Sequence, residues 1–256
     1  MSSLWPTQGR AATKPRETGV TMLIDNGYPT GYFTDVVSSH GDYIDFIKFG
    51  WGTALVTRDI EKKVKCARDN DVAFCLGGTF FEKCLAEDKL DEFEDLYKKL
   101  GARHMEISNG TIDLGNEEKA IYIKRYAGDY EVFSEVGYKD TERSQELHPA
   151  KWIEYIEQDL AAGATRVITE ARESGTSGIC RADGEVRFGL ISEIGAMVDI
   201  DKLIFEAPNK SLQVYFIKKF GPNVNLANIA FGDVIGLETL RNGLRGDTLE
   251  LFGPAK

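Results

Sequence analysis

Charged side chains recur at one kind of place in this chain, directly after short hydrophobic runs that are rich in β-branched residues. Four of them are glutamates, namely Glu106, Glu135, Glu170 and Glu206. Carboxylates that point toward one space repel each other unless cations share that space. The pattern therefore predicts a bound cation, and oxygen ligands without Cys or His favour Mg2+ over zinc. We take Glu106, Glu135 and Glu170 as the candidate metal ligands.

Lysine and arginine side chains offer a second source of positive charge, which leaves a metal-free alternative open. The bases that could pair with the glutamates are Lys48, Lys139, Arg172 and Lys210. In this alternative the two kinds of charge form a network that perturbs the pKa values of its members without any bound ion. In both interpretations, acids and bases at the ends of strands indicate a site for a small anionic substrate.

Glycines and uncharged polar residues follow the same hydrophobic runs. At 49–53 (FGWGT) and 77–79 (GGT), backbone N–H groups can approach a phosphate or carboxylate closely, although each segment could also be only a tight turn. Arg241 and Arg245 lie where barrels frequently hold phosphate, unless they form a pair on the outer surface. The candidate substrate-binding residues are Gly78, Thr79, Ser108, Asn109, Arg172, Asn209, Lys210 and Asn228.

These residues need a scaffold that brings the ends of strands together. Short β-branched runs alternate with longer amphipathic stretches, as in a parallel sheet covered by helices. The expected strands are 20–25, 43–48, 72–76, 104–108, 131–136, 166–170, 202–206 and 223–226. The expected helices are 58–70, 82–100, 117–126, 150–162, 188–197, 210–220 and 234–243.

Eight strands in 256 residues predict an α/β protein of the (β/α)8 or TIM-barrel class, because an open doubly wound sheet of this length usually has fewer strands. One barrel domain is expected over 18–256, after an N-terminal arm at 1–17 that shows no periodicity. The longest loops, 138–149 and 171–187, follow strands and would lie over the mouth of the barrel. Asn225 is expected at the same mouth, at the end of the eighth strand.

Composition and charge exclude several other classes of protein. The net charge of -10 argues against nucleic acid or an anionic membrane as a partner held by a general basic surface. No stretch approaches the roughly 18 apolar residues of a transmembrane helix, and the first residues lack the apolar core of a signal peptide, so a cytoplasmic location is expected. The four cysteines form no CxxC pair and the three histidines are widely spaced, which disfavours zinc, disulfides and a Ser-His-Asp triad.

Ten ordered runs of the chain carry a family resemblance. They are KPRETG (14–19), IDNGYP (24–29), DYIDFIKFGWGT (42–53), GGTFFEK (77–83), EISNGT (106–111), SEVGYKD (134–140), VITEARESGTSGIC (167–180), IFEAPNK (204–210), NVNLANI (223–229) and LETLRNGLRGDT (237–248). Together they span nearly the whole chain from Lys14 to Thr248. In these runs the chain resembles phosphosulfolactate synthase, especially the bacterial branch of that family.

The resemblance implies a (β/α)8 barrel and a Mg2+-dependent addition of sulfite to phosphoenolpyruvate, which yields (2R)-2-phospho-3-sulfolactate. In methanogens this reaction opens coenzyme M biosynthesis, and in spore-forming bacteria it is associated with sulfolactate biosynthesis. Attack by sulfite pushes charge into the substrate carboxylate, where Mg2+ and nearby cations would stabilise the aci-carboxylate intermediate. Family members are often oligomeric, so the resemblance allows a homo-oligomer, although the sequence identifies no interface.

The resemblance also implies a lysine that protonates C2 of the substrate and lies just after the fifth strand. Where the archaeal proteins have two consecutive lysines after EVG, this chain has Tyr138 and then Lys139; where they have DKG near the first strand, it has DNG at 25–27. We take Lys139 as the proton donor and Lys48 and Glu135 as the other catalytic candidates. Neighbouring cations and burial are expected to lower the proton affinity of this lysine.

Three functions remain open at this point. The first is the synthase itself. The second is another barrel lyase, such as an aldolase acting on a phosphorylated enol or 2-oxo acid, whose Schiff base on Lys139 or Lys48 borohydride would trap. The third is a non-catalytic, stress-related member, as plant heat-stress relatives of the family suggest. The retained acids and bases at the strand ends favour an enzyme, because a structural role does not require them.

Overall fold

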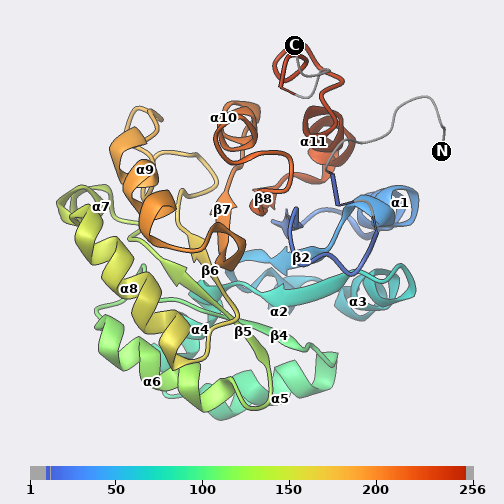
Figure 1. The fold of residues 1–256 in the computed structure, drawn as a ribbon. Coiled ribbons are helices and arrows are strands. Elements are labelled where there is room, and N and C mark those ends of the chain that lie inside the picture. Colours follow the sequence, from blue (N-terminus) through green and yellow to red (C-terminus); the bar gives the residue numbers. More distant parts are fainter. Residues whose placement is uncertain (1–9, 12, 252–256) are drawn as a thin grey trace.

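Eight parallel strands form the wall of a barrel in the computed structural model, which describes residues 10–11 and 13–251 (Figure 1). The strands are β1 Thr21–Asp25, β2 Phe46–Phe49, β3 Ala73–Leu76, β4 His104–Ile107, β5 Glu131–Val136, β6 Arg166–Thr169, β7 Leu203–Glu206 and β8 Leu226–Ile229. Their order in the sheet is β3-β2-β1-β8-β7-β6-β5-β4, so β1 pairs with β8 and only the seam between β3 and β4 lacks a ladder. The predicted TIM barrel is confirmed.

Helices follow the strands and surround the barrel (Figure 1). They are α1 Thr30–His40, α2 Thr53–Val56, α3 Ile60–Asp69, α4 Gly78–Ala86, α5 Leu90–Leu100, α6 Asn116–Tyr126, α7 Thr141–Glu146, α8 Pro149–Ala162, α9 Phe188–Met197, α10 Lys210–Phe220 and α11 Val234–Arg241. Short 3-10 turns lie at Gly41–Tyr43, Gly50–Gly52, Ile200–Lys202 and Phe231–Asp233. No helix in the described part of the chain is long and apolar enough to cross a membrane.

Apolar side chains fill the barrel between its two ends. This inner cluster is separate from the larger one that packs the strands against the helices, and it consists of Val20, Met22, Phe46, Cys75, Phe133, Ile168, Ile204 and Ala227. The strands are buried almost throughout, as expected when helices cover the outside of a barrel and side chains fill the inside. Polar groups at the two ends of the barrel are therefore separated by an apolar layer.

Four local predictions were wrong. The helix expected over 82–100 is two helices, because the chain turns at Asp88, whose φ is 55°. The helix α1 was missed, since its Thr, Ser and Gly residues mask a buried face made by Phe33, Val36 and Val37. The loop expected over 138–149 contains α7, whose first turn is capped by the side chain of Asp140.

The fourth error concerns the last strand, which begins three residues later than predicted. Asn225 consequently lies before β8, at the opposite end of the barrel from the one expected. Its amide donates to the carbonyl of Leu203 at 3.0 Å, and its Oδ1 accepts from the backbone N–H of Val20 at 3.0 Å. Asn225 thus joins the N-terminal ends of neighbouring strands and takes no part in the mouth.

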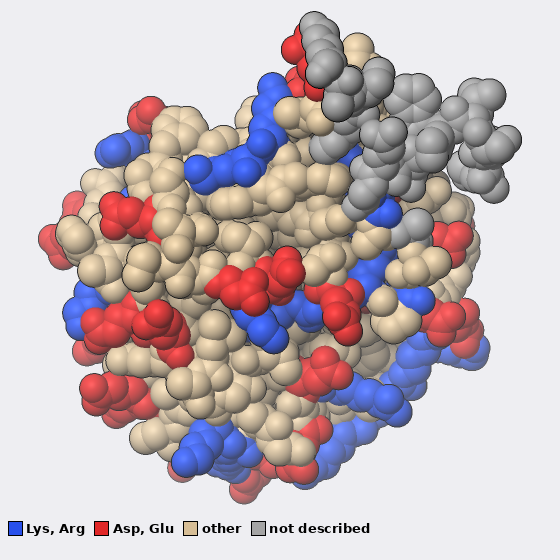
Figure 2. Space-filling model, viewed as in Figure 1, with Lys and Arg blue, Asp and Glu red and all other residues tan. Residues whose placement is uncertain are grey.

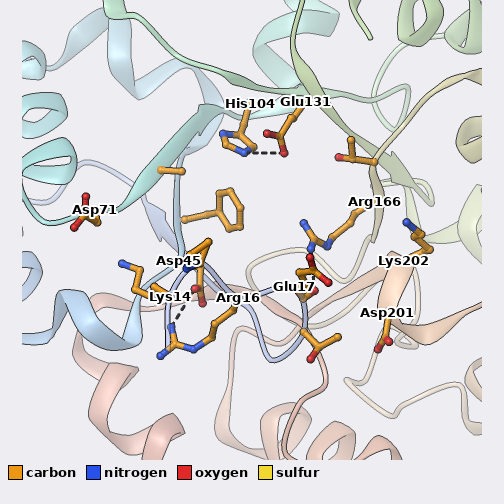
Figure 3. Close-up of a pocket in the computed structure, with 15 residues that line it drawn as sticks. Lys14, Arg16, Glu17, Asp45, Asp71, His104, Glu131, Arg166, Asp201 and Lys202 are labelled. Carbon is orange, nitrogen blue, oxygen red and sulfur yellow. Dashed lines mark hydrogen bonds and ion pairs between the residues drawn. The ribbon is translucent and has the colours of Figure 1, made fainter. Parts of the chain in front are cut away.

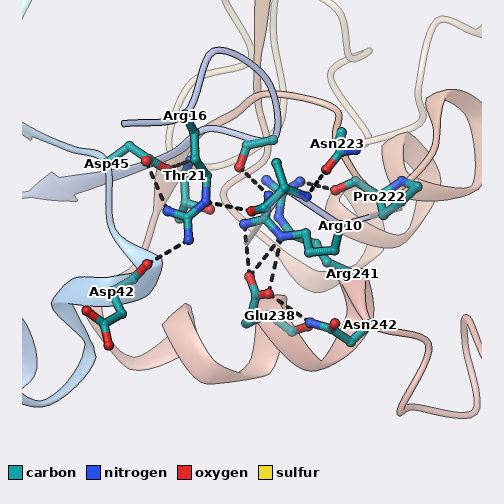
Figure 4. Close-up of polar contacts among 12 residues, drawn as sticks. Arg10, Arg16, Thr21, Asp42, Asp45, Pro222, Asn223, Glu238, Arg241 and Asn242 are labelled. Atoms are coloured by element: carbon teal, nitrogen blue, oxygen red, sulfur yellow. Dashed lines mark hydrogen bonds and ion pairs between the residues drawn. The ribbon is translucent and has the colours of Figure 1, made fainter. Parts of the chain in front are cut away.

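The described part of the predicted arm packs against the N-terminal end of the barrel, while residues 1–9 and 12 of the arm lie outside the described residues (Figure 4). Arg10 pairs with Glu238 at 3.0 Å and donates to the carbonyl of Gly19 at 2.8 Å. Arg16 pairs with Asp45 at 3.0 Å. Both arginines are buried, so this segment is a fixed part of the barrel floor.

Arg241 also belongs to this floor, which corrects its expected place near a phosphate site or on the outer surface. Its guanidinium donates to the carbonyls of Pro222 at 2.6 Å, Val224 at 2.7 Å and Val20 at 3.1 Å (Figure 4). Val20 precedes β1, and Pro222 and Val224 precede β8. A single buried side chain therefore ties together the two strands at which the first and last parts of the barrel meet.

We expect Arg241→Met to destabilise the protein by about 3–5 kcal/mol, because the carbonyls of Pro222 and Val224 would lose the donor that Arg241 provides, whereas that of Val20 also accepts from the N–H of Leu226 at 2.9 Å. The measurement is the free energy of unfolding in urea. The matched control is Arg181→Met, since the Arg181 side chain is 59% exposed and its pair with Glu185 is worth about 0–1 kcal/mol. Equal stability of the two variants would contradict this role for Arg241.

Candidate active site

A cavity of about 630 Å³ opens at the end of the barrel where the strands have their carboxyl ends. Its lining residues are Ile24, Lys48, Gly50, Trp51, Gly77, Gly78, Thr79, Glu106, Thr111, Glu135, Lys139, Glu170, Arg172, Glu173, Ser174, Glu206 and Asn228. All four glutamates singled out in the sequence are among them, and they come from β4, β5, β7 and the end of β6. In this fold the active site is found at this end of the barrel.

Lys48 holds the centre of the cluster. Its Nζ lies 3.2 Å from Glu106, 3.2 Å from Glu206 and 3.8 Å from Glu135. Burial alone would lower the pKa of Lys48, but these three carboxylates outweigh burial and raise it well above its ordinary value. The ammonium group is therefore charged at neutral pH, and it joins β2 to three other strands across the mouth.

Lys139 is the second lysine of the cluster and lies closer to the opening. Its Nζ is 2.9 Å from Glu135 and 3.0 Å from Glu170, and 23% of its side chain is exposed. Burial lowers the pKa of Lys139, whereas Glu135 and Glu170 raise it, and the net result is a pKa well above its ordinary value. The prediction that its proton affinity would be lowered was wrong, because its neighbours are carboxylates and not cations.

The carboxylates differ in their affinity for protons, although all are buried. Burial raises the pKa of Glu135, but Lys139 and Lys48 overcome this effect and bring it down to about 2. Burial raises the pKa of Glu106 to about 6, with Lys48 only partly offsetting it. Burial, together with repulsion from Glu135 and Glu206, raises the pKa of Glu170 well above its ordinary value. Groups whose pKa values are pushed apart in one cavity are typical of active sites.

Two backbone N–H groups fix the orientation of these carboxylates. The N–H of Gly78, at the first turn of α4, donates to Glu106 at 2.6 Å. The N–H of Arg172 donates to Glu170 at 2.6 Å, and Arg172 has a φ of 60°. A side chain at position 78 would collide with Ser108, so the close approach requires glycine.

A family model described as (2R)-phospho-3-sulfolactate synthase (ComA) matches residues 9–247 of the chain. The chain belongs to this family. The phosphosulfolactate synthase of Bacillus subtilis (strain 168) is 53% identical over 239 residues, which make up 93% of this chain and 95% of the relative. That of Methanocaldococcus jannaschii is 46% identical over 234 residues, 90% of this chain and 93% of the relative.

Solved structures add support for the fold alone. The YdjI aldolase from Escherichia coli K12 has a TM-score of 0.56 at 13% identity, with 84% of this chain and 76% of that chain covered. The family resemblance read from the ten sequence runs is confirmed, and relatives named as phosphosulfolactate synthases make this chain a member of an enzyme family.

Half of the substrate-binding residues predicted for this synthase family member line the cavity, namely Gly78, Thr79, Arg172 and Asn228. Asn228 is 5% exposed and has a φ of 56°, a strained backbone conformation that costs about 1–3 kcal/mol and is typical of functional sites. Its buried Oδ1 accepts no hydrogen bond from the described residues. The catalytic candidates Lys48, Lys139 and Glu135 lie together in the same cavity.

The other four predicted substrate-binding residues do not line the cavity, because the side chain of each is engaged elsewhere. Ser108 donates to Glu82 at 2.5 Å, and Asn109 donates to the carbonyl of Leu114 at 2.8 Å. Asn209 caps α10, where its Oδ1 accepts from the N–H of Leu212 at 3.1 Å, and Lys210 pairs with Asp247 at 2.6 Å. Capping and turn formation favour the same residue types as ligand binding, so the sequence could not separate these uses.

Sequence reasoning did not single out Thr111 of the lining, whereas Trp51 lies in the segment expected at 49–53 and Ser174 in the loop expected over the mouth at 171–187. It also missed Glu82 of α4, whose carboxylate accepts from the N–H groups of Thr111 at 2.7 Å and Ile112 at 2.8 Å as well as from Ser108. Glu82 is buried, and it holds the loop after β4 against α4. A glutamate on a helix offers no sequence signal of this kind, because most helical glutamates are exposed.

A second cavity, of about 880 Å³, lies at the N-terminal end of the barrel (Figure 3). The polar residues around it contact one another, as Arg16 pairs with Asp45 at 3.0 Å and His104 Nε2 lies 3.3 Å from the carboxylate of Glu131. In this fold that end serves stability. Figure 2 shows both acidic and basic side chains spread over the face in view.

His104 generates a prediction on stability and pH. Burial lowers the pKa of His104, and the carboxylate of Glu131 offsets this only in part. Because the folded-state pKa lies below the unfolded value of about 6.5, the contribution of the neutral ring is complete above that pH and is lost as the pH falls through the folded-state pKa. We expect the free energy of unfolding to fall more between pH 7.5 and 5 in the wild type than in His104→Gln. An identical pH dependence would contradict this assignment.

Proposed function

We propose that the protein catalyses the addition of sulfite to phosphoenolpyruvate, giving (2R)-2-phospho-3-sulfolactate. The observation that carries the proposal is the buried cluster of lysines and glutamates at the mouth of the barrel, in a chain that is 53% identical to a phosphosulfolactate synthase. Substrates of this kind carry several negative charges in a small volume. Lys48, Lys139 and Arg172 are the cations of the lining that would attract them.

In the proposed reaction the lone pair on the sulfur of sulfite attacks C3 of phosphoenolpyruvate and forms the carbon–sulfur bond. The electron pair of the C2–C3 double bond moves into the carboxylate, and the resulting aci-carboxylate then takes a proton at C2. Lys139 is the proposed donor, because it is protonated, partly exposed and held by two carboxylates. Its high pKa does not prevent the transfer, since a carbon acid of this type is a much weaker acid than an ammonium group.

The donor set of the cavity fits Mg2+. Four buried carboxylates face two lysines, and Glu106 Oε2 and Glu170 Oε2 accept no hydrogen bond from the described residues, although a lysine Nζ lies 3.2 and 3.0 Å from them. The described residues contain no group of three or more acids, Cys or His arranged to hold a metal. Mg2+ commonly takes only one or two carboxylates, with water and substrate oxygens as the rest. Glu106, Glu135 and Glu170 are the proposed sources, and the ion would supply positive charge for the intermediate.

The aldolase alternative finds no support in the site. A Schiff-base lysine must lose its proton readily, which requires a lowered pKa. Lys48 and Lys139 both have a raised pKa because carboxylates surround them. A non-catalytic role is also disfavoured. Burying like charges together costs stability, and a purely structural role gives no reason to retain them.

The direct test is incubation of the purified protein with phosphoenolpyruvate, sulfite and Mg2+, followed by phosphorus NMR. We expect the phosphoenolpyruvate signal to be replaced by that of phosphosulfolactate only when all three are present. Failure to form product over a range of pH and metal would reject the proposal. Borohydride trapping of substrate on Lys48 or Lys139 would instead support an aldolase.

We expect Lys139→Ala to lower kcat by about 10²–10⁴-fold, the usual contribution of a general acid, while the protein remains folded. The measurement is steady-state turnover together with a thermal unfolding curve. Lys151→Ala is the matched control, because Lys151 is an exposed lysine on α8 that pairs with Glu154 and does not line the cavity. A rate near that of the wild type would remove Lys139 from the mechanism.

Removal of divalent metal is expected to abolish turnover, and added Mg2+ is expected to restore it. The reason is that two lysines cannot neutralise four carboxylates together with two anionic substrates. The assay compares the rate in a chelator, in a chelator with excess Mg2+ and in untreated protein. Full activity in the chelator would show that the lysines alone provide the positive charge.

A further inference from the structure

A second pair of opposite charges lies outside the barrel wall, where β5 is covered by α6 and α8. Lys119 of α6 and Asp159 of α8 are fully buried, and their Nζ and Oδ2 atoms are 2.7 Å apart. Asp159 also accepts from the hydroxyl of Ser134 and from the amide of Asn116, the latter at 3.2 Å. Neither member of the pair lines the cavity of the candidate active site.

Lys119 reaches the main chain of β5 at a residue of the candidate active site. Its Nζ donates to the carbonyl of Glu135 at 2.9 Å. The ladder between β4 and β5 ends at Ile107 and Ser134, so the carbonyl of Glu135 lies one residue beyond it. The lysine therefore takes the place of a strand neighbour at the point where β4 has already turned away.

Stability alone does not account for this pair. Apolar residues of similar volume usually stabilise such a position as well as a buried ion pair or better, because the charges lose their hydration. An apolar pair would, however, leave the carbonyl of Glu135 without a donor. Lys119 therefore acts on a single residue, Glu135. The carboxylate of Glu135 points into the barrel mouth and contacts Lys139 at 2.9 Å.

We propose that Lys119, held by Asp159, is a positioning residue that sets the place of Glu135 and through it of Lys139. The proposal rests on the proposed function in so far as Lys139 is the proton donor. Lys119 touches neither substrate nor cavity, so its effect passes through the backbone of β5. A displacement of about 1 Å in a reacting group can lower a rate by about 10²-fold.

The test is the double variant Lys119→Met/Asp159→Asn, which leaves no unpaired charge in the interior and keeps an acceptor for Ser134. We expect it to fold but to melt below the wild type, because the carbonyl of Glu135 loses its donor, with kcat lowered about 10- to 100-fold and KM for phosphoenolpyruvate changed less than about 3-fold. The matched control is Lys151→Met/Glu154→Gln, which removes an exposed pair of 2.8 Å on α8 and should leave kcat unchanged. Wild-type kcat in a folded double variant would overturn the proposal.

A readout without substrate separates this proposal from the proposed function. Brief acylation with acetic anhydride, followed by peptide mass spectrometry, gives the reactivity of Lys139 relative to the exposed Lys65. Release of Glu135 should increase this ratio in the double variant, whether or not the protein makes phosphosulfolactate. An unchanged ratio would overturn the positioning role. If the double variant does not fold, Ser134→Ala provides the test. Loss of this donor to Asp159 should lower kcat and raise the reactivity ratio of Lys139, each by a smaller factor than in the double variant.

Discussion

Four carboxylates and two ammonium groups lie together in a buried space at one end of the barrel. The arrangement of the barrel mouth depends on the neutralisation of these negative charges by the two positive ones. Lys48 sits between three of the carboxylates, each on a different strand, so its removal would leave like charges facing each other in the interior. Such an arrangement forms only on a closed wall that holds the strand ends in fixed positions. The apolar layer below it, which includes Phe133 and Ile168, separates these charged side chains from the N-terminal end of the barrel.

The two ends of the barrel use charge in different ways. At the N-terminal end, arginines such as Arg10 and Arg241 donate to backbone carbonyls and to single carboxylates, and these contacts close the floor. At the other end, lysines contact several carboxylates at once and oppose the effect of burial on them; they outweigh burial at Glu135, whose pKa is lowered, but not at Glu106, whose pKa is raised. Guanidinium groups suit fixed multiple hydrogen bonds, whereas an ammonium group is a compact charge that can serve changing partners. The chemistry of the two ends thus follows from the choice of base.

The barrel and the centre of its mouth could be predicted from the sequence because both depend on residues at strand ends. Hydrophobic runs that end in a charge place Lys48 and Glu106 without knowledge of any tertiary contact. The use of Asn209 and Ser108 could not be predicted, since a helix cap, a turn and a ligand contact all require short polar side chains. The buried position of Lys119 could not be predicted for another reason. A lysine on an amphipathic helix is normally exposed, and only the packing of three elements shows that this one is buried.

The proposed reaction places two demands on Lys139, which must be protonated before the transfer and must regain its proton afterwards. Glu135 and Glu170 satisfy the first demand, because both raise the pKa of Lys139 and keep it charged at neutral pH. They also satisfy the second. A neutral amine would leave these two carboxylates facing each other without a counter-charge, so the return of a proton is strongly favoured. With 23% of the side chain exposed, that proton can come from solvent. The carboxylates that hinder release of the proton in the resting enzyme are thus the groups that restore it after each turnover, and this balance is possible only if the acceptor carbon is the stronger base.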